Sequence, residues 1–222
     1  MALPGIVIQR VENPSDARVD EDVDLFFSLM KEDVALKSLV GGEPEKIDGM
    51  GRAMLRAGIL AGEYYEATDE KDGSLLGYLM TMPPGQDLFS TDEQRALGLT
   101  EFMANLSPEG KEYYRTTYLA EFPAFVNACL GPTGKLDSWY IHMVMVQREH
   151  QGRGIGKGLI SQVVEKASRS GDVIAMSTTT EVNSVIYQKC GLTLLDKKIM
   201  PSPWGEWPLY ILSLDTKSLK QA

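Results

Sequence analysis

The residues from Gln151 to Gly158 are the part of this sequence with the clearest chemical meaning. They read QGRGIGKG and lie between an apolar run, Trp139 to Val146, and a segment of helical periodicity that begins at Ile155. A strand, a glycine-rich turn and a helix in this order place backbone N–H groups at the helix N-terminus, where they can bind an anion. Because glycines alternate through the turn, few side chains would keep the anion from the backbone. The pattern indicates a ligand that carries phosphate.

Two other phosphate loops can be compared with the same residues, and neither fits. A P-loop requires G-x-x-x-x-G-K-[ST], but here the Gly156-Lys157 pair is followed by a glycine, so no hydroxyl is present for Mg²⁺. A Rossmann turn requires G-x-G-x-x-G. Counted from Gly152 or from Gly154, the third glycine position holds a lysine or a leucine. Both nucleotide-binding motifs are therefore excluded by residue identity.

Composition limits the remaining classes of protein. The 222 residues are 43% hydrophobic and 24% charged, which suits a globular protein with one large core. A net charge of −9 argues against a nucleic-acid surface. Two cysteines and two histidines leave too few ligands for a zinc site, so no metal is expected. No apolar stretch approaches the ~20 residues that span a bilayer, and the N-terminus lacks a signal-peptide pattern. We therefore expect a reduced, cytoplasmic protein.

Hydrophobic periodicity and turn residues predict the elements that position the glycine-rich turn. Strands are expected at 6–11, 63–68, 75–82, 139–146, 173–178, 192–199 and 208–214. Helices are expected from Asp20 to the Gly41-Gly42 pair, from Pro44, over 155–167 and over 181–189. The order is β, two helices, a β-hairpin, a helical insertion and then β-α-β-α-β-β. It predicts one α/β (α+β) domain with a mixed sheet.

The insertion, about residues 86–137, is expected to be helical and rich in aromatic residues. Thr91 and Ser107 have the character of helix N-caps, whereas Pro123 should end or bend its helix. The insertion falls between the third and fourth strands, where it could overhang a substrate site. Its aromatic side chains either pack between helices or line such a site: Tyr113, Tyr114, Tyr118, Phe122 and Phe125.

The six residues from Gln151 to Gly156 fit the Q/R-x-x-G-x-G/A loop, and through it the sequence resembles the GNAT N-acetyltransferase superfamily. The segment NSVIYQKCGL, from Asn183 to Leu192, is similar to the family pattern N-x-x-x-Y-x-K-x-G-F, with Leu192 in place of the usual phenylalanine. The likeness is close over about 139–195, and the N-terminal half shares only the order of elements.

This resemblance implies a fold and a co-substrate. The fold is a single GNAT domain over residues 1–222, with a mixed, mostly antiparallel sheet of about seven strands flanked by helices. Acetyl-CoA would bind where the fourth and fifth strands splay apart. The backbone of four strand residues would pair with its pantetheine arm: Met143, Val144, Met145 and Val146. The amides of the loop would bind its pyrophosphate: Gln151, Gly152, Arg153, Gly154, Ile155, Gly156 and Lys157. The Arg153 and Lys157 side chains either add charge or remain solvated.

The resemblance also implies direct attack by an amine on the thioester, without an acyl-enzyme. Tyr187 matches the family tyrosine whose phenol points at the CoA sulfur, and a phenol with a pKa of about 10 can protonate a departing thiolate. The alternative is a core tyrosine. Asn183 lies one helical turn earlier on the same face, where it either bonds the pantetheine amides or caps the helix.

The base is expected on the fourth strand. Alternation places Tyr140, His142 and Val144 on one face, and the imidazole of His142 suits proton removal near neutral pH. Some relatives use a glutamate in this region, which this strand lacks. The other interpretation of His142 is a core histidine, and His150 is expected to be exposed.

Together these features predict an N-acyltransferase that moves an acetyl group from acetyl-CoA to a primary amine of a small molecule within a ternary complex. The partners expected are the amine alone, with no nucleic acid and no membrane, and the protein is a monomer or homodimer. The alternative is a non-catalytic acyl-CoA-binding or regulatory module of the same fold. A longer acyl donor is a third possibility.

Overall fold

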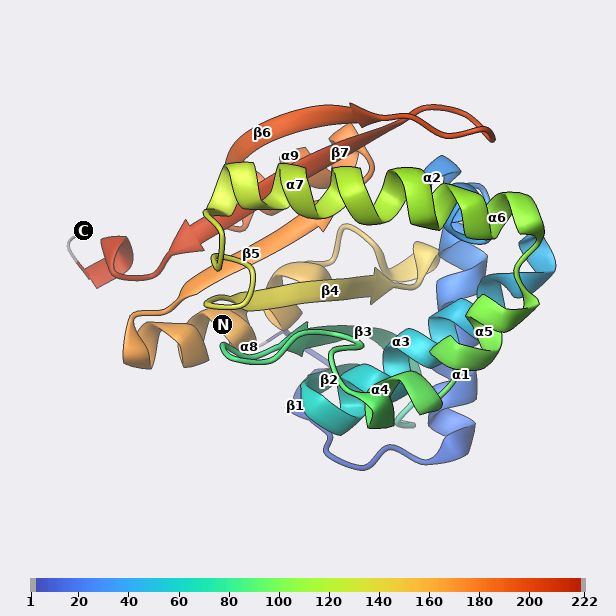
Figure 1. Cartoon of the computed structure of the whole chain (residues 1–222). Coiled ribbons are helices and arrows are strands. Elements are labelled where there is room, and N and C mark those ends of the chain that lie inside the picture. Colours follow the sequence, from blue (N-terminus) through green and yellow to red (C-terminus); the bar gives the residue numbers. More distant parts are fainter. Residues whose placement is uncertain (1–2, 221–222) are drawn as a thin grey trace.

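The computed structural model describes residues 3–220, and its centre is a seven-stranded sheet in the order β1-β2-β3-β4-β5-β7-β6 (Figure 1). The strands are β1 (Ile6–Arg10), β2 (Glu63–Asp69), β3 (Leu75–Met82), β4 (Trp139–Val146), β5 (Val173–Thr178), β6 (Thr193–Met200) and β7 (Trp207–Asp215). Neighbouring strands are antiparallel except β4 and β5, which are parallel. The predicted mixed, mostly antiparallel sheet flanked by helices is confirmed.

Helices cover both faces of this sheet. They are α1 (Asp16–Met30), α2 (Val34–Leu39), α3 (Ile47–Ala61), α4 (Asp92–Ala96), α5 (Leu99–Asn105), α6 (Pro108–Tyr113), α7 (Leu119–Leu130), α8 (Ile155–Ser170) and α9 (Glu181–Lys189). One face packs against α8 and α9 in a continuous core cluster. The opposite face carries two separate clusters, one beneath α1 and α3 and the other beneath α7. Within residues 3–220, no helix combines the length and apolarity needed to cross a bilayer.

The first helix differs from the prediction at both ends. It begins after Ser15, whose hydroxyl accepts a hydrogen bond from the Arg18 N–H at 3.2 Å, and not at Asp20. It ends at Met30, and α2 starts after a new N-cap, Asp33. Asp20 lies inside the helix because a cap further upstream already satisfies the first turn. The apolar periodicity was continuous across the break, so it could not reveal two helices.

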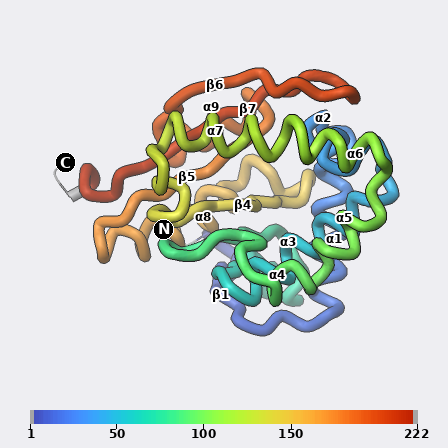
Figure 2. The backbone as a smooth tube through the Cα atoms, in the orientation of Figure 1, coloured from blue at the N-terminus to red at the C-terminus, as the bar shows by residue number. Residues whose placement is uncertain are grey.

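The insertion runs from the end of β3 through α4, α5 and α6 and returns along α7 (Figure 2). Thr91 and Ser107 cap α4 and α6, as predicted. Pro123 neither ends nor precedes α7 but lies inside it, so the prediction that it ends the helix is wrong. A π-helical turn, Tyr114–Tyr118, directly precedes Leu119, the residue whose carbonyl the proline cannot bond.

A β-bulge in β4 overturns the simple alternation expected for this strand. Ile141 pairs with Thr81 and Met143 pairs with Met80, so His142 is the extra residue on β4. Beyond the bulge, Met143 packs in the core under α1 and α3, whereas Val144 packs on the α8 side. Ile141 packs on the α8 side as well, so Val144 shares a face with Ile141 and the prediction that it shares a face with Tyr140 and His142 is wrong.

Helix α1 carries a buried carboxyl group. Asp22 has no exposed surface, and its Oδ2 accepts a hydrogen bond from the Tyr64 hydroxyl at 2.5 Å. Burial raises the pKa of Asp22 to about 7; the Tyr64 hydrogen bond opposes this rise. In the unfolded chain the same group titrates near pH 3.8. The folded state therefore binds more protons between these two values, and stability falls as the pH rises through this window.

Replacing Asp22 by asparagine is expected to remove that loss, because an amide keeps the acceptor for Tyr64 and carries no charge. The free energy of unfolding above neutral pH should rise by about 3 kcal/mol. Urea unfolding at roughly pH 5 and roughly pH 8 measures it, with Asp20→Asn on the exposed side of α1 as control. If the free energy of unfolding of Asp22→Asn differed between the two pH values by as much as that of the wild type, the role assigned to Asp22 would be refuted.

Candidate active site

The strands β4 and β5 separate partway along the sheet. They pair only from Trp139 to Ile141, opposite Ile174 to Met176. β4 continues along β3 as far as Val146, and β5 continues along β7 as far as Thr178. Between His142 and Val146, the edge of β4 that faces β5 has no strand partner among residues 3–220. An open edge of this kind can hydrogen-bond an extended ligand as an added strand.

The open edge leads into the glycine-rich turn. Gly152 and Gly154 have φ values of 77° and 85°, a left-handed conformation that favours glycine. Within the described chain, the N–H groups from Gly152 to Lys157 donate to no acceptor, and the first bond of α8 joins Gly158 N–H to the Gly154 carbonyl. Free donors at a helix N-terminus, together with the helix dipole, form an anion-binding arrangement.

Side chains of the turn hold it in place. The Gln151 amide donates to the Val146 carbonyl at 3.0 Å, which ties the turn to the end of β4. The guanidinium of Arg153 lies 2.7 Å from Nδ1 of His150, so both side chains are engaged locally. Lys157 is exposed and forms no ion pair within the described residues. The backbone amides and Lys157 therefore remain for a ligand.

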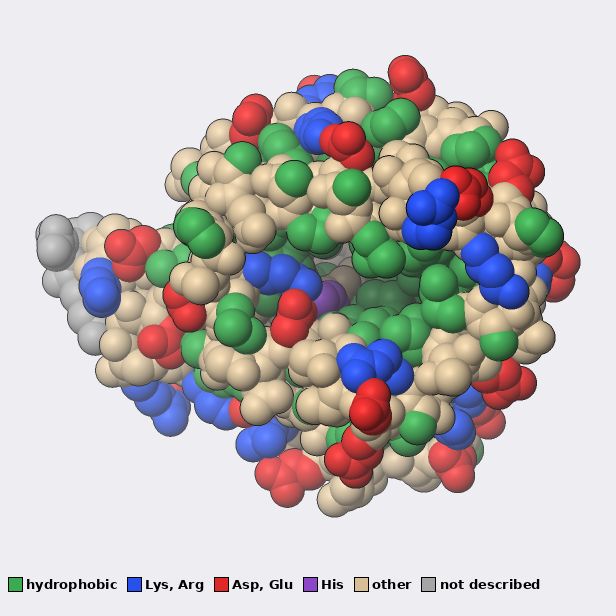
Figure 3. All heavy atoms as spheres, in the orientation of Figure 1, with side chains coloured by type: hydrophobic (Ala, Val, Ile, Leu, Met, Phe, Trp, Pro, Cys, Tyr) green, Lys and Arg blue, Asp and Glu red, His purple; other side chains and the backbone are tan. Residues whose placement is uncertain are grey.

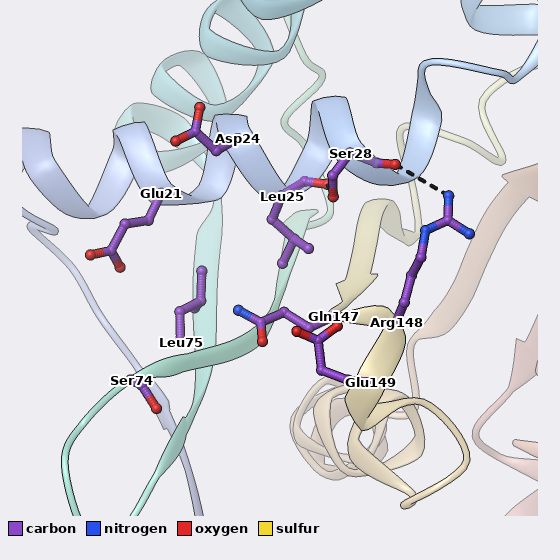
Figure 4. A pocket seen from close by; sticks show the side chains of 9 residues that line it. All are labelled: Glu21, Asp24, Leu25, Ser28, Ser74, Leu75, Gln147, Arg148 and Glu149. Carbon is purple, nitrogen blue, oxygen red and sulfur yellow. Dashed lines mark hydrogen bonds between the residues drawn. The ribbon is translucent and has the colours of Figure 1, made fainter.

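A cavity of about 590 Å³ lies beside the approach to this turn, between α1, the start of β3 and the segment after β4 (Figure 4). The guanidinium of Arg148 donates to the Ser28 carbonyl at 3.2 Å across it. Three carboxylates line it, from Glu21, Asp24 and Glu149. None of the residues that line the cavity belongs to the open edge of β4. The hydrogen bond from Arg148 to Ser28 connects the segment before the turn to α1.

Helix α9 carries the predicted residues Asn183 and Tyr187. Thr180 caps the helix by accepting from the Asn183 N–H, so capping is not the role of the Asn183 side chain. The Tyr187 hydroxyl forms no hydrogen bond among the described residues, although only 9% of the residue is exposed. Burial, followed by the nearby Cys190 thiol, raises the pKa of Tyr187 to about 12. Its phenol is therefore protonated at neutral pH.

The start of α8 and the end of α9 face each other. Burial raises the pKa of the Cys190 thiol, and the ammonium group of Lys157 opposes that shift. The turn with its free amides thus lies next to the helix that carries Tyr187. The structure brings the two sequence motifs to the two sides of one wedge, the gap that opens where β4 and β5 separate after Ile141.

His142 lies at the apex of the wedge, where β4 leaves β5. Its Nε2 is buried without a hydrogen-bond partner in the described part of the chain, and its ring lies 4.9 Å from the Tyr140 ring. Burial, and then the ammonium of Lys135, hold the pKa of His142 well below 6.5. The imidazole is therefore neutral near pH 7 and can accept a proton.

A hollow opens over β4 on the side away from α8. Figure 3 shows it between α7 and the α4–α5 region, with hydrophobic side chains around it and a histidine at its floor. His142 is the histidine that β4 contributes. The hollow therefore gives access to the apex of the wedge from the side of the sheet opposite α8.

Two polar contacts around β4 and β5 were not predicted from the sequence. Asp87 pairs with Lys135 at 2.7 Å, and Lys135 lies 5.0 Å from the centre of the Tyr140 ring. Asp33 accepts from the Thr179 hydroxyl at 2.6 Å, which links the start of α2 to the end of β5. The partners are far apart in the chain and belong to loops, so no local pattern indicates them.

Gly77 on β3 is expected to be essential for the shape of the open edge. A Cβ at this position would lie 2.4 Å from the Met145 carbonyl oxygen, which is backbone and cannot move independently of β4. Gly77→Ala should lower the free energy of unfolding by about 2 kcal/mol, and it should weaken about tenfold the binding of the acetyl-CoA that the sequence resemblance implies. Urea unfolding and calorimetry measure the two effects. Gly49→Ala, in the open on α3, is the control; equal results for both variants would contradict this account.

Comparison with known proteins agrees with this geometry. The family described as the acetyltransferase (GNAT) domain matches residues 114–192, which include β4, the glycine-rich turn and α9. Arylalkylamine N-acetyltransferase 2 from Aedes aegypti is 14% identical with a TM-score of 0.62, and the match covers 95% of this chain and 99% of that one. Polyamine N-acetyltransferase from Drosophila melanogaster is 14% identical with a TM-score of 0.57, over 95% and 99% of the two chains.

A third similar structure is yncA from Salmonella typhimurium, determined with its cofactor acetyl-CoA. It is 13% identical with a TM-score of 0.54, and the match covers 96% of this chain and 94% of that one. The predicted resemblance to the GNAT superfamily is confirmed: residues 114–192 match its acetyltransferase domain, and the described chain has the GNAT fold.

Proposed function

We propose that the protein is an N-acetyltransferase that transfers the acetyl group of acetyl-CoA to a primary amine of a small molecule. One observation carries the proposal: the open edge of β4 connects a neutral buried histidine to a turn of free amide groups. The names of the Aedes and Drosophila structures support an amine acceptor. On this proposal the protein acts in the cytoplasm, as a monomer or homodimer.

The residues of the wedge fit acetyl-CoA. The unpaired backbone from Met143 to Val146 would bond its pantetheine arm, and the amides from Gln151 to Lys157 would bond its pyrophosphate. No atom lies within 4 Å of a Cβ built at Gly152, so the turn is open on that side. Asn183, whose side chain forms no hydrogen bond within residues 3–220, would bond a pantetheine amide. Acetyl-CoA itself would supply the thioester carbon that the amine attacks.

Two side chains of this chain would move protons. His142 accepts the proton that the amine loses as the carbon–nitrogen bond forms, because its imidazole is neutral. Tyr187 donates a proton to the sulfur as the carbon–sulfur bond breaks, because its phenol is protonated. Attack is direct, and neither free cysteine, Cys129 or Cys190, takes part.

The test is titration of acetyl-CoA by calorimetry, followed by measurement of free thiol in the presence of an amine panel. Saturable binding and thiol release that requires an amine are expected. Absence of acetyl-CoA binding would contradict the proposal. Binding without thiol release for any amine would favour the regulatory module instead.

A further inference from the structure

The hollow over β4 has apolar walls that belong to two different parts of the core. The buried clusters under α1 and α3 and under α7 do not merge on this face of the sheet. Half-buried apolar side chains stand at their margins, among them Leu88 and Met103 on one side and Phe122 and Cys129 on the other. Figure 3 shows hydrophobic side chains on both sides of the hollow. Apolar surface left half-exposed around a recess is typical of a small-molecule site.

Tyr118 is the side chain that joins the two margins. It packs against both clusters, and it is stacked on Phe122 with ring centres 5.2 Å apart. It lies in the π-helical turn before α7, a backbone form that is frequent at functional sites. Burial, and then Tyr140 and other neighbours, raise the pKa of Tyr118, so its phenol stays neutral opposite β4. Its hydroxyl forms no hydrogen bond within the described chain.

The charges beside the hollow cancel each other. The Asp87 carboxylate contributes to the raised pKa of both Tyr118 and Tyr140. It forms an ion pair with the Lys135 ammonium at 2.7 Å. The Lys135 ammonium also contributes to the lowered pKa of His142, so a further positive charge beside His142 would be repelled. A second ammonium group on the acceptor would therefore be desolvated against apolar walls without a free carboxylate from Asp87.

We propose that this hollow binds the acceptor, and that the acceptor is a primary amine on an aromatic or similarly bulky apolar group without a second charge. Tyr118 and Phe122 contact the apolar group, and the amine reaches His142 at the floor. This inference rests on the proposed transferase function and specifies which amines the enzyme acetylates.

Amine selectivity tests the assignment. Thiol release with acetyl-CoA is measured for phenethylamine, butylamine, putrescine and an amino acid. The kcat/KM for phenethylamine should exceed that for putrescine and for the amino acid at least about tenfold. Preference for putrescine or the amino acid would overturn the inference while leaving the transferase function intact. If no amine releases thiol, the proposed function fails. The calorimetric measurement of phenethylamine binding then tests by itself whether the hollow binds an apolar amine.

Binding is measured by calorimetry of phenethylamine with the protein saturated with CoA, a mixture in which no transfer occurs. Tyr118→Ala should raise the Kd about fivefold, and Tyr118→Phe, which keeps the ring, should change it little. Leu119→Ala, at the next position and 59% exposed, is the control for folding. The Kd for CoA itself should be the same in all variants. No difference between Tyr118→Ala and Leu119→Ala in phenethylamine binding would overturn the assignment.

Discussion

Replacement of Tyr187 by phenylalanine is expected to lower kcat about a hundredfold, with little change in the Kd for acetyl-CoA. The variant keeps the ring that packs in the core. It removes the hydroxyl, which forms no hydrogen bond with any described residue. Because burial raises the pKa of Tyr187 to about 12, the wild-type phenol is protonated across the neutral range and can donate to a departing thiolate. Steady-state rates of thiol release, together with calorimetry, separate the loss of turnover from any loss of binding.

Tyr65→Phe is the matched control for this variant. Its hydroxyl is also buried, but it donates to Glu63 on β2, away from the wedge. Its loss should reduce stability by about 1 kcal/mol and leave kcat unchanged. If Tyr187→Phe retained full turnover, the hydroxyl would not be the acid, and Tyr187 would be a core residue only.

His142→Gln is expected to lower kcat about a hundredfold near neutral pH and to remove the acid limb of the pH profile. In the wild type, kcat at saturating substrates should fall only as the pH drops well below 6.5, since burial and Lys135 lower the pKa of His142. Protonation below that pKa removes the base, so the rate declines toward acid and not toward alkali. The pH dependence of kcat, with and without added imidazole, is the measurement.

The second histidine provides the control for that experiment. His150 lies in the segment before the glycine-rich turn, beside Arg153, and His150→Gln should retain both the rate and the acid limb. Recovery of part of the lost rate by imidazole in His142→Gln alone would support a missing base. An acid limb that persists unchanged in His142→Gln would show that another group titrates.

The same group affects folding in a predictable direction. The pKa of His142 is lower in the folded state than in the unfolded chain, so the unfolded chain binds more protons just below pH 6.5. Stability contributed by neutral His142 is therefore lost as the pH falls through this region. Asp22 acts in the opposite direction between its two pKa values, which makes Asp22→Asn the better background for observing the histidine.

The sequence predicted those elements whose pattern is local. The strand Trp139–Val146 and the helix Glu181–Lys189 have the predicted bounds, because a continuous apolar run and a capped, glycine-ended helix contain their own boundary signals. The glycine-rich turn lies between strand and helix as expected, with left-handed φ values at two of its glycines. The hairpin strand Leu75–Met82 was also predicted without error.

Features that depend on contacts distant in sequence were not predictable. The bulge at His142 arises from the register of β4 against β3, which no pattern within β4 records. The ion pair of Asp87 with Lys135 joins two loops, and the wedge exists because β4 and β5 follow different neighbours. Pro123 was predicted to end or bend its helix, whereas it lies inside α7, which follows directly on a π turn.

The central claim is that acetyl passes directly from acetyl-CoA to an amine at the apex of the wedge. Its most direct test mixes purified protein with acetyl-CoA and phenethylamine and follows free thiol and acetylated amine together, while the intact mass of the protein is monitored. We predict one thiol for each acetylated amine and no acetyl adduct on the protein. Release of thiol without an acetylated amine, or an acetylated protein that forms and decays with turnover, would contradict the account.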